Sequence, residues 1–245
     1  RGVTAISDSC FEKCNGLKTI ILPPQIKKIE RAAFMQSGLE TISLNEGLEY
    51  VESNVFVDTF IKSIRLPKTL RDFHHTAASV SMSDITMESY VPHIKAGIIK
   101  PYKPGNDTDK IIILHCEDRH AILPRHTKNT TYSEYMKAVD ELFKDKTTNH
   151  TEFWQYAYTA KGKEDGALEE YLFSESEDAK EYVKKISKKI ALRLIDEGEE
   201  EKLVKLLKTG VVSKPTLKTI LPKVKEQDLT AAQSYVLEQL NGKGI

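Results

Sequence analysis

The sequence predicts an α+β protein in which a short solenoid of stacked strands is capped by a β-hairpin and followed by an all-helical domain of helical hairpins. Three observations lead to this fold class. Apolar residues recur about every 22 positions over the first hundred residues. A segment rich in proline and glycine follows at 100–109, and from Thr130 onward the apolar period becomes about 3.6.

The repeat consists of six apolar columns that recur together. One column steps by 23, 22, 22 and 21 residues through Val3, Ile26, Leu48, Leu70 and Val91. Each unit closes with a block of the form LxxIxL, such as Leu17, Ile20 and Leu22. A period near 22 is typical of leucine-rich repeats, whose units are a short strand plus a return segment that only stacking can bury. We therefore predict a leucine-rich-repeat solenoid over residues 1–101.

The strands of this solenoid predict a binding face. Period-2 alternation within each LxxIxL block turns the leading apolar side chains inward and the intervening ones outward. Stacking places the outward side chains in adjacent rows on one exposed sheet. The predicted binding residues are Thr19, Ile21, Thr41, Ser43, Ser63 and Arg65.

The unit ISDSCFEKCNGLKTIILP resembles the BspA-type leucine-rich repeats of bacteria. In that family an aromatic residue follows the first isoleucine by five positions, as Phe11 does here, and cysteine is frequent at the place of Cys14. Proline follows the strand, as at Pro23 and Pro67. The asparagine ladder of the common repeat form is not matched. The resemblance covers about residues 1–100 and weakens where Ala78 replaces the aromatic residue, as expected of a terminal, capping repeat.

Residues 102–126 are expected to form a linker and a hairpin cap. The segment KIIILHCEDRHAILP indicates two strands, 111–116 and 120–123, around a polar turn at 117–119. Pairing of this hairpin with the last strand of the solenoid would cover an edge whose backbone groups are otherwise unsatisfied.

The hairpin also gathers His115, Cys116, His120 and His126, residue types that ligate zinc. Their spacing matches no closed zinc motif, and adjacent residues of a strand point to opposite faces. We therefore predict ordinary hairpin side chains and no metal site. A metal-dependent hydrolase built around 115–126 stays open as the less favoured alternative.

Residues 127–245 are predicted to form a helical domain. Ser133 and Thr151 are expected to cap two helices, the second over 152–160, and a short helix is expected over 164–173. The clearest helix is 177–196, followed by helices over 199–210, 213–224 and 229–242. Their short length, and glycines just past the helix ends at Gly198 and Gly210, are similar to ankyrin-like helix pairs, although the TPLHxA signature is absent.

Composition and motifs argue against several function classes. The 36 basic residues balance the 36 acidic ones, and glutamates follow the lysine-rich stretch 184–193, so we predict no nucleic-acid binding. None of the GxSxG, HExxH, Walker or GxGxxG patterns occurs, so we predict no enzyme, no catalytic residues and no cofactor. No apolar run approaches the roughly 18–20 residues of a membrane span. We interpret Cys14 as a packed core thiol.

These observations favour a non-catalytic protein–protein interaction module that binds a protein partner through the strand face. A bacterial surface adhesin is the alternative that the BspA-type resemblance implies, because such proteins are associated with surface attachment in some bacteria. The cysteine content favours the cytoplasm, whereas a signal peptide ahead of Arg1 would place the protein on the cell surface or outside the cell. The oligomeric state and the identity of the partner are not encoded in any motif.

Overall fold

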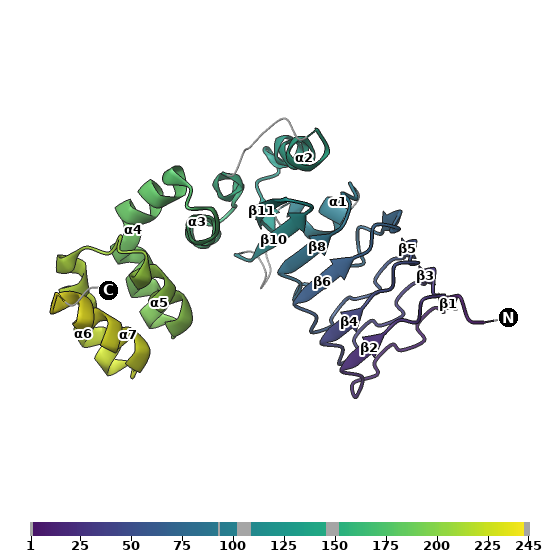
Figure 1. Cartoon of the computed structure of the whole chain (residues 1–245), viewed down its shortest axis with the longest axis horizontal. Coiled ribbons are helices and arrows are strands. Elements are labelled where there is room, and N and C mark those ends of the chain that lie inside the picture. Colours follow the sequence, from purple (N-terminus) through teal and green to yellow (C-terminus); the bar gives the residue numbers. More distant parts are fainter. Residues whose placement is uncertain (1, 93, 102–108, 146–151, 243–245) are drawn as a thin grey trace. The chain divides into compact units, whose positions relative to one another are not determined.

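The computed structural model describes residues 2–92, 94–101, 109–145 and 152–242 of the chain (Figure 1). The chain divides into two compact units, Arg1–Gly166 and Ala167–Ile245, which are described one at a time. Most of the expected linker, residues 102–108, lies outside the described residues. The domain limits expected at 101/102 and 126/127 were drawn where the type of secondary structure changes, not where packing separates compact units. They stay a prediction.

The first unit contains a solenoid in which each coil contributes two short strands (Figure 1). One wall is the parallel sheet of β1 (Ala5–Ile6), β3 (Lys28–Ile29), β5 (Tyr50–Val51) and β7 (Asp72–Phe73). The other wall contains β2 (Thr19–Ile21), β4 (Thr41–Ser43), β6 (Ser63–Leu66) and β8 (Asp84–Met87). On that wall β2 pairs with β4, β4 lies beside β6, and β6 pairs with β8. We number the coils 1 to 4 in chain order, so that coil 1 holds β1 and β2. The predicted solenoid is confirmed.

The return segments of the first three coils turn through pairs of left-handed residues. Positive φ angles recur four positions apart, at Ser9 and Lys13, Ala32 and Gln36, and Asn54 and Asp58. Between each pair, backbone N–H groups donate to carbonyls of the next coil, as Phe11 does to Ala33 at 2.8 Å and Phe34 to Val55 at 3.1 Å. These bonds satisfy backbone groups of the turns, which offsets the usual cost of a left-handed conformation outside glycine.

A stack of aromatic rings runs through the core between the two walls. The ring centroids of Phe11 and Phe34 lie 5.3 Å apart, those of Phe34 and Phe56 6.0 Å, and those of Phe56 and Phe73 6.4 Å. Phe73 belongs to a different column, whose earlier members are Ile6, Ile29 and Val51. Its larger side chain therefore compensates for the missing ring at Ala78, so the core stays filled where the repeat pattern weakens.

A hairpin of β10 (Ile111–Cys116) and β11 (Arg119–Pro124) caps the last coil. Strand β10 pairs in parallel with β8, so that Leu114 lies opposite Ile85. Short elements surround the hairpin: α1 (Ile94–Ile98), and β9 (Lys100–Pro101) paired with β12 (His126–Thr127). The predicted hairpin and its pairing with the solenoid edge are confirmed.

Helical elements of the first unit pack on the same core. Helix α2 (Tyr132–Asp140) buries Tyr135 and Val139 and ends in a π-helical turn, Glu141–Asp145. The helix expected over 152–160 is wrong: only a 3-10 turn, Phe153–Tyr156, forms. A β-bridge between Thr127 and Ala157 holds the chain out of helical conformation there. Helix α3 (Ala160–Ser174) starts earlier than expected, in the first unit, and ends in the second.

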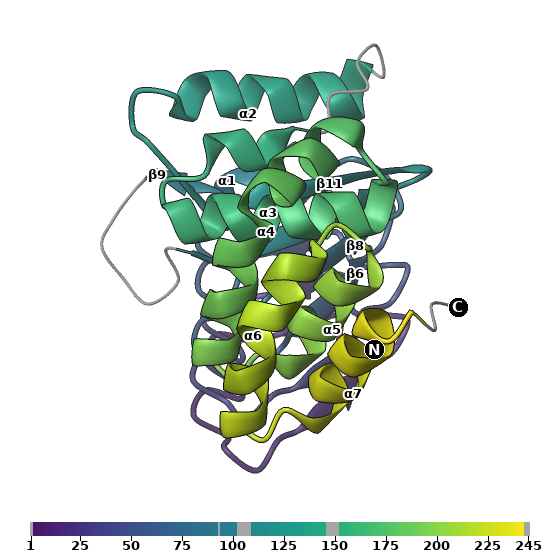
Figure 2. The same ribbon diagram turned by 90° about the vertical axis from the view of Figure 1, so that its left-hand side faces the viewer.

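The second unit is built of helical hairpins. After the end of α3 come α4 (Glu177–Asp196), α5 (Glu200–Lys208), α6 (Lys214–Glu226) and α7 (Thr230–Leu240). Helix α4 packs on α5 and α6, and α7 packs on the same two helices (Figure 2). The hydroxyls of Ser176 and Ser213 cap the N-termini of α4 and α6. Gly198 and Gly210, which follow helix ends, adopt φ angles of 70° and 72°, and glycine can do so because it has no Cβ to clash. In the described part of the chain, no helix combines the length and apolarity that crossing a membrane requires.

Candidate protein-binding face

All six predicted binding residues are exposed on β2, β4 and β6. The parallel register places Thr19 opposite Thr41 and Ile21 opposite Ser43. Between them, Ile42 and Ile64 are buried, and Ile20 is partly buried on coil 1. We call the outward side of β2, β4 and β6 the strand wall.

The strand wall carries a hollow of about 720 Å³ on coils 2 and 3. Three of the predicted residues, Thr41, Ser63 and Arg65, line it, whereas Thr19, Ile21 and Ser43 lie on the same wall outside it. The complete lining is Glu40, Thr41, Ile42, Phe60, Lys62, Ser63 and Arg65.

The repeat pattern did not single out three residues of this hollow, Glu40, Phe60 and Lys62, and Phe60 is the most unusual of them. Its side chain is 60% exposed, which is unusual for a large aromatic group. The position directly before the LxxIxL block is Gly16 in coil 1, Gly38 in coil 2 and Ser81 in coil 4. The sequence did contain a signal for Phe60. It is a large apolar residue outside the inward columns, at a position where the other coils have a small residue.

Phe60 is approached by a cation from two coils away. The Lys18 ammonium lies 5.7 Å from the centroid of the Phe60 ring, within the range of a cation–π contact. Coil 2 has Gly38 at the intervening position, so no side chain of that residue separates the two groups. The same ammonium is 2.8 Å from a carboxylate oxygen of Glu40, so its charge already has a partner.

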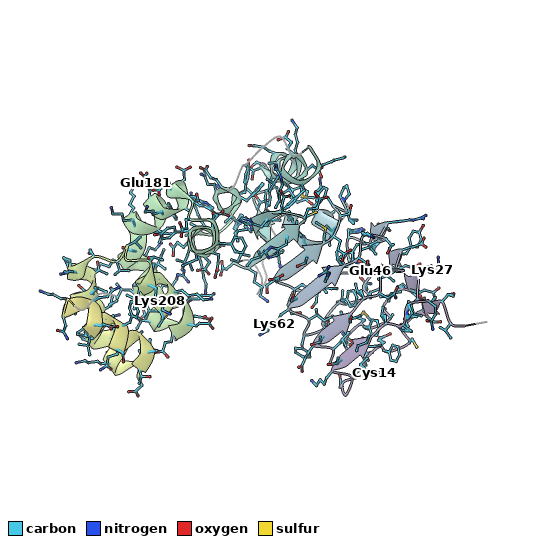
Figure 3. The ribbon with its side chains drawn as sticks, viewed as in Figure 1. Cys14, Lys27, Glu46, Lys62, Glu181 and Lys208 are labelled. Carbon is cyan, nitrogen blue, oxygen red and sulfur yellow. The ribbon has the colours of Figure 1, made fainter. Side chains whose placement is uncertain are left out.

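The charges around the hollow differ in how far they are paired. Arg65 donates from Nε to Glu88 at 3.1 Å, and this hydrogen bond raises the pKa of Arg65 and lowers that of Glu88. Lys62 is exposed and projects outward (Figure 3). Within the described residues, no ion pair involves Lys62. The hollow therefore combines an exposed ring, two hydroxyls and a cation that faces solvent.

The wall of β1, β3, β5 and β7 has a different character. Its outward charges form ion pairs between neighbouring coils: Lys28 with Glu52 at 2.6 Å, and Arg31 with Asp8 at 3.0 Å. Glu49 bridges both of its neighbours, with Lys27 at 3.0 Å and Arg71 at 3.4 Å. We call this side the ion-pair wall.

The hairpin histidines do not form a metal centre in the described structure. Cys116 and His126 are buried, whereas His115 and His120 lie opposite each other in the hairpin and are partly exposed. Burial, with a smaller contribution from His115, lowers the pKa of His120. Over the described residues, no group of three or more His, Cys, Asp or Glu side chains is placed to hold a metal ion.

The interpretation of Cys14 as a core thiol is wrong, because its side chain is exposed. Its counterparts in coils 2 and 3, Ser37 and Thr59, are buried. The difference arises from position in the stack: coil 1 is covered by a neighbouring coil on one side only in this structure.

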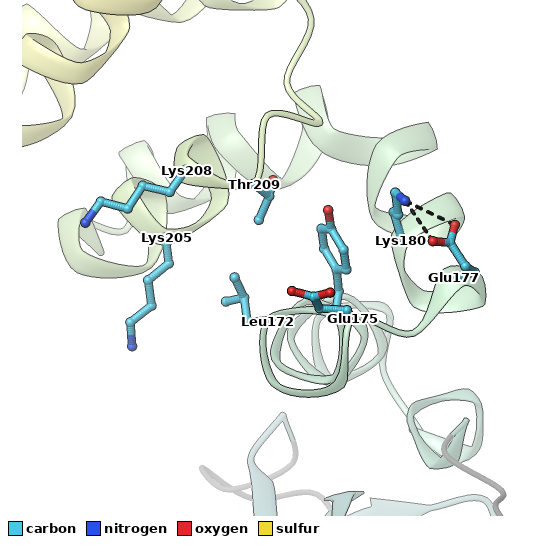
Figure 4. Close-up of a pocket in the computed structure, with 8 residues that line it drawn as sticks. Leu172, Glu175, Glu177, Lys180, Lys205, Lys208 and Thr209 are labelled. Atoms are coloured by element: carbon cyan, nitrogen blue, oxygen red, sulfur yellow. Dashed lines mark hydrogen bonds and ion pairs between the residues drawn. The ribbon is translucent and has the colours of Figure 1, made fainter. Parts of the chain in front are cut away.

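The second unit has a hollow of its own, about 410 Å³, between the end of α3, the start of α4 and α5 (Figure 4). Charges of both signs line it, and some of them are paired. Glu177 binds Lys180 at 2.8 Å, and Lys205 binds Glu201 at 3.2 Å. This lining mixes three lysines with two glutamates, so it does not single out a ligand of one charge.

Comparison with protein families agrees with the geometry of the first unit. Residues 1–100 match the model of the BspA type leucine rich repeat region, in six copies. This part of the chain is therefore a BspA-type repeat region, as the resemblance indicated, and such repeats are typical of protein-interaction or adhesin-type modules. No curated protein and no solved structure matches the chain.

Proposed function

We propose that the chain is a non-catalytic protein–protein interaction module that binds a partner protein through the strand wall. The observation that carries this proposal is the hollow in which exposed Phe60 stands beside Thr41, Ser63 and Arg65. The repeat family supports the general class of function, and the hollow supports the location.

The composition of the wall suits a protein interface. Phe60 and Ile21 are 60% and 75% exposed, so a partner that covers them removes apolar surface from water. Aromatic and arginine side chains are enriched at the energetic centres of interfaces, and hydroxyl groups serve a polar rim. The core holds the stacked strands in place, so binding carries little entropy cost for ordering their backbone.

A pull-down from a lysate of the source organism tests the location of binding. The parent chain is compared with an Arg65→Glu, Thr41→Arg double variant, each with unchanged thermal unfolding. A Thr4→Arg, Arg71→Glu double variant is the matched control. Arg71, like Arg65, pairs with a glutamate of a neighbouring coil, and Thr4, like Thr41, is exposed. We expect a partner that the parent and the control retain and the strand-wall variant loses. Equal retention by all three chains, or no retained protein, would refute the assignment.

A surface adhesin is the second candidate, and the BspA-type match favours it. The two roles share the strand wall and differ in where the partner lies. Antibody labelling of intact cells distinguishes them: labelling without permeabilisation supports an adhesin, and labelling only after permeabilisation supports an internal interaction module.

A further inference from the structure

We propose that the hollow on coils 2 and 3 binds an acidic segment of the partner protein in which a carboxylate lies next to an apolar side chain. This inference rests on the proposed function, since it names the chemistry that the same strand wall recognises. It is carried by the juxtaposition of exposed Phe60 with Lys62 and Arg65 around one hollow.

The apolar half of the site is the Phe60 ring. Glycine and serine at the equivalent positions of the other coils show that the stack does not need a large side chain there. The residue is 60% exposed, so its ring contributes little to the core. Its one described cationic neighbour, Lys18, approaches to 5.7 Å and leaves most of the ring accessible. An apolar partner side chain would therefore find a preformed contact.

The charged half of the site is cationic. Two cations, Lys62 and Arg65, and one acid, Glu40, line the hollow, and Glu40 is already bound by Lys18. The Arg65 side chain remains 71% exposed despite its pairing with Glu88. Because a guanidinium has five N–H donors, Arg65 keeps donors for a second carboxylate. An incoming carboxylate thus meets Lys62, which has no ion pair among the described residues, and Arg65, which has N–H donors to spare.

The acids nearby argue against a polyanion as the ligand. Acids lie among the cations on this side of the repeats: Glu40 beside Lys18, Glu88 beside Arg65, and Asp84 beside His115. Nucleic-acid binding depends on an extended excess of basic residues, which this surface lacks. A short acidic and apolar peptide segment needs only the local cations of the hollow.

Selection from a displayed library of random 12-residue peptides on the immobilised full chain tests the inference. We expect the parent to enrich peptides in which Asp or Glu lies within a few positions of Phe, Tyr, Trp or Leu. The best enriched sequence is then synthesised with a fluorescent label, and its affinity is measured by anisotropy. We expect Lys62→Glu and Phe60→Ser each to weaken binding at least tenfold. A peptide with its acids replaced by lysine should bind Lys62→Glu better than it binds the parent.

Matched variants on the ion-pair wall serve as controls. Tyr50→Ser removes an exposed aromatic ring, and Arg71→Glu reverses an exposed charge, so neither should change the affinity of the acidic peptide. Enrichment of peptides without acidic residues, absence of enrichment, or indifference to both Lys62→Glu and Phe60→Ser would overturn the inference.

The same experiment separates this inference from the proposed function. Selected peptides that lack acids but lose binding to the Arg65→Glu, Thr41→Arg variant would overturn the inference and leave the strand wall as the binding surface. Selected peptides that bind this variant as well as the parent would overturn both.

Discussion

The two walls of the solenoid come from the same repeat, yet they differ in how completely their outward charges are paired. On the ion-pair wall, charges of neighbouring coils neutralise one another, as Glu49 does with Lys27 and Arg71. On the strand wall, Ile21 and Phe60 are exposed and Lys62 has no ion pair among the described residues. Inward positions are constrained by packing on both walls, whereas outward positions are not. A surface whose outward charges are already paired with one another has fewer groups left to bind a partner.

Loss of an inner ring of the aromatic stack should damage both walls at once and give the largest effect. Phe34 is fully buried between Phe11 and Phe56. We expect Phe34→Ala to lower the free energy of unfolding by about 3–5 kcal/mol, because it removes apolar contacts and leaves a cavity. Denaturant unfolding measures the change. Phe11→Ala on the outermost coil should cost less, and an equal loss at both positions would contradict a stack that is supported from both sides.

A close backbone contact of coil 2 gives the next largest effect. A Cβ at Gly38 would lie 2.0 Å from the carbonyl oxygen of Asn15, whereas a Cβ at Gly16 would meet no atom within 4 Å. We expect Gly38→Ala to destabilise the chain by about 1–3 kcal/mol, as forced overpacking does. Gly16→Ala should leave the midpoint of chemical unfolding nearly unchanged. Similar results for the two variants would show that coils 1 and 2 do not approach as described.

The contact between coil 4 and helix α2 should give a smaller, pH-dependent effect. Tyr90 donates a hydrogen bond to Asp140 at 2.8 Å, and burial, together with this carboxylate, raises the pKa of Tyr90 far above its usual value. The unfolded state then loses a proton near pH 10 and the folded state does not, so stability falls as the pH rises above about 10.

Tyr90→Phe should remove part of this alkaline loss, and it should lower the free energy of unfolding by about 1 kcal/mol at neutral pH, because a buried hydrogen bond is lost. Unfolding curves at neutral and alkaline pH measure both quantities. An unchanged slope above pH 10 would assign the alkaline loss to other groups, such as buried Tyr135, whose pKa is also raised by burial.

The smallest effect should come from the ion-pair wall itself. Hydrogen bonding to Lys27, and the nearby charges of Lys27 and Arg71, lower the pKa of Glu49. Its contribution to stability is therefore present above its unfolded pKa and disappears as the pH falls through the folded value. Glu49→Gln should shift the thermal midpoint less than any variant above, and the shift should largely disappear in high salt, because Lys27 and Arg71 are exposed and Glu49 is only partly buried. A salt-independent loss would indicate a structural role for Glu49 beyond charge.

The repeat columns predicted the solenoid because their spacing reports stacking directly. The exposed residues of β2, β4 and β6 followed from alternation within each strand. Phe73 supplies the aromatic ring that is missing at Ala78. Neither column alone predicts this, because it depends on how side-chain volumes add across the core. Phe60 was missed for a related reason, since the repeat pattern defines the inward positions and leaves the residue before each block undescribed.

Local patterns also failed where a distant contact decides the conformation. The residues around Phe153 and Trp154 have helical spacing, but the bridge from Ala157 to Thr127 limits them to one 3-10 turn. In the second unit, by contrast, helix 177–196 was predicted with its observed bounds, because a long apolar stripe and Gly198 just beyond its end define it locally; the structure adds a cap by Ser176.

Three successive coils contribute to the hollow and its surroundings: Glu40 from coil 2 and Phe60 from coil 3 line it, and Lys18 from coil 1 contacts both, with Gly38 leaving room between Lys18 and Phe60. Its recognition properties therefore belong to the order of the coils and not to any one of them. Duplicating or exchanging whole coils would preserve the inward columns and the fold while creating or erasing such a hollow. Proteins built from these repeats can thus acquire new ligands by rearranging units, without a single substitution in the core.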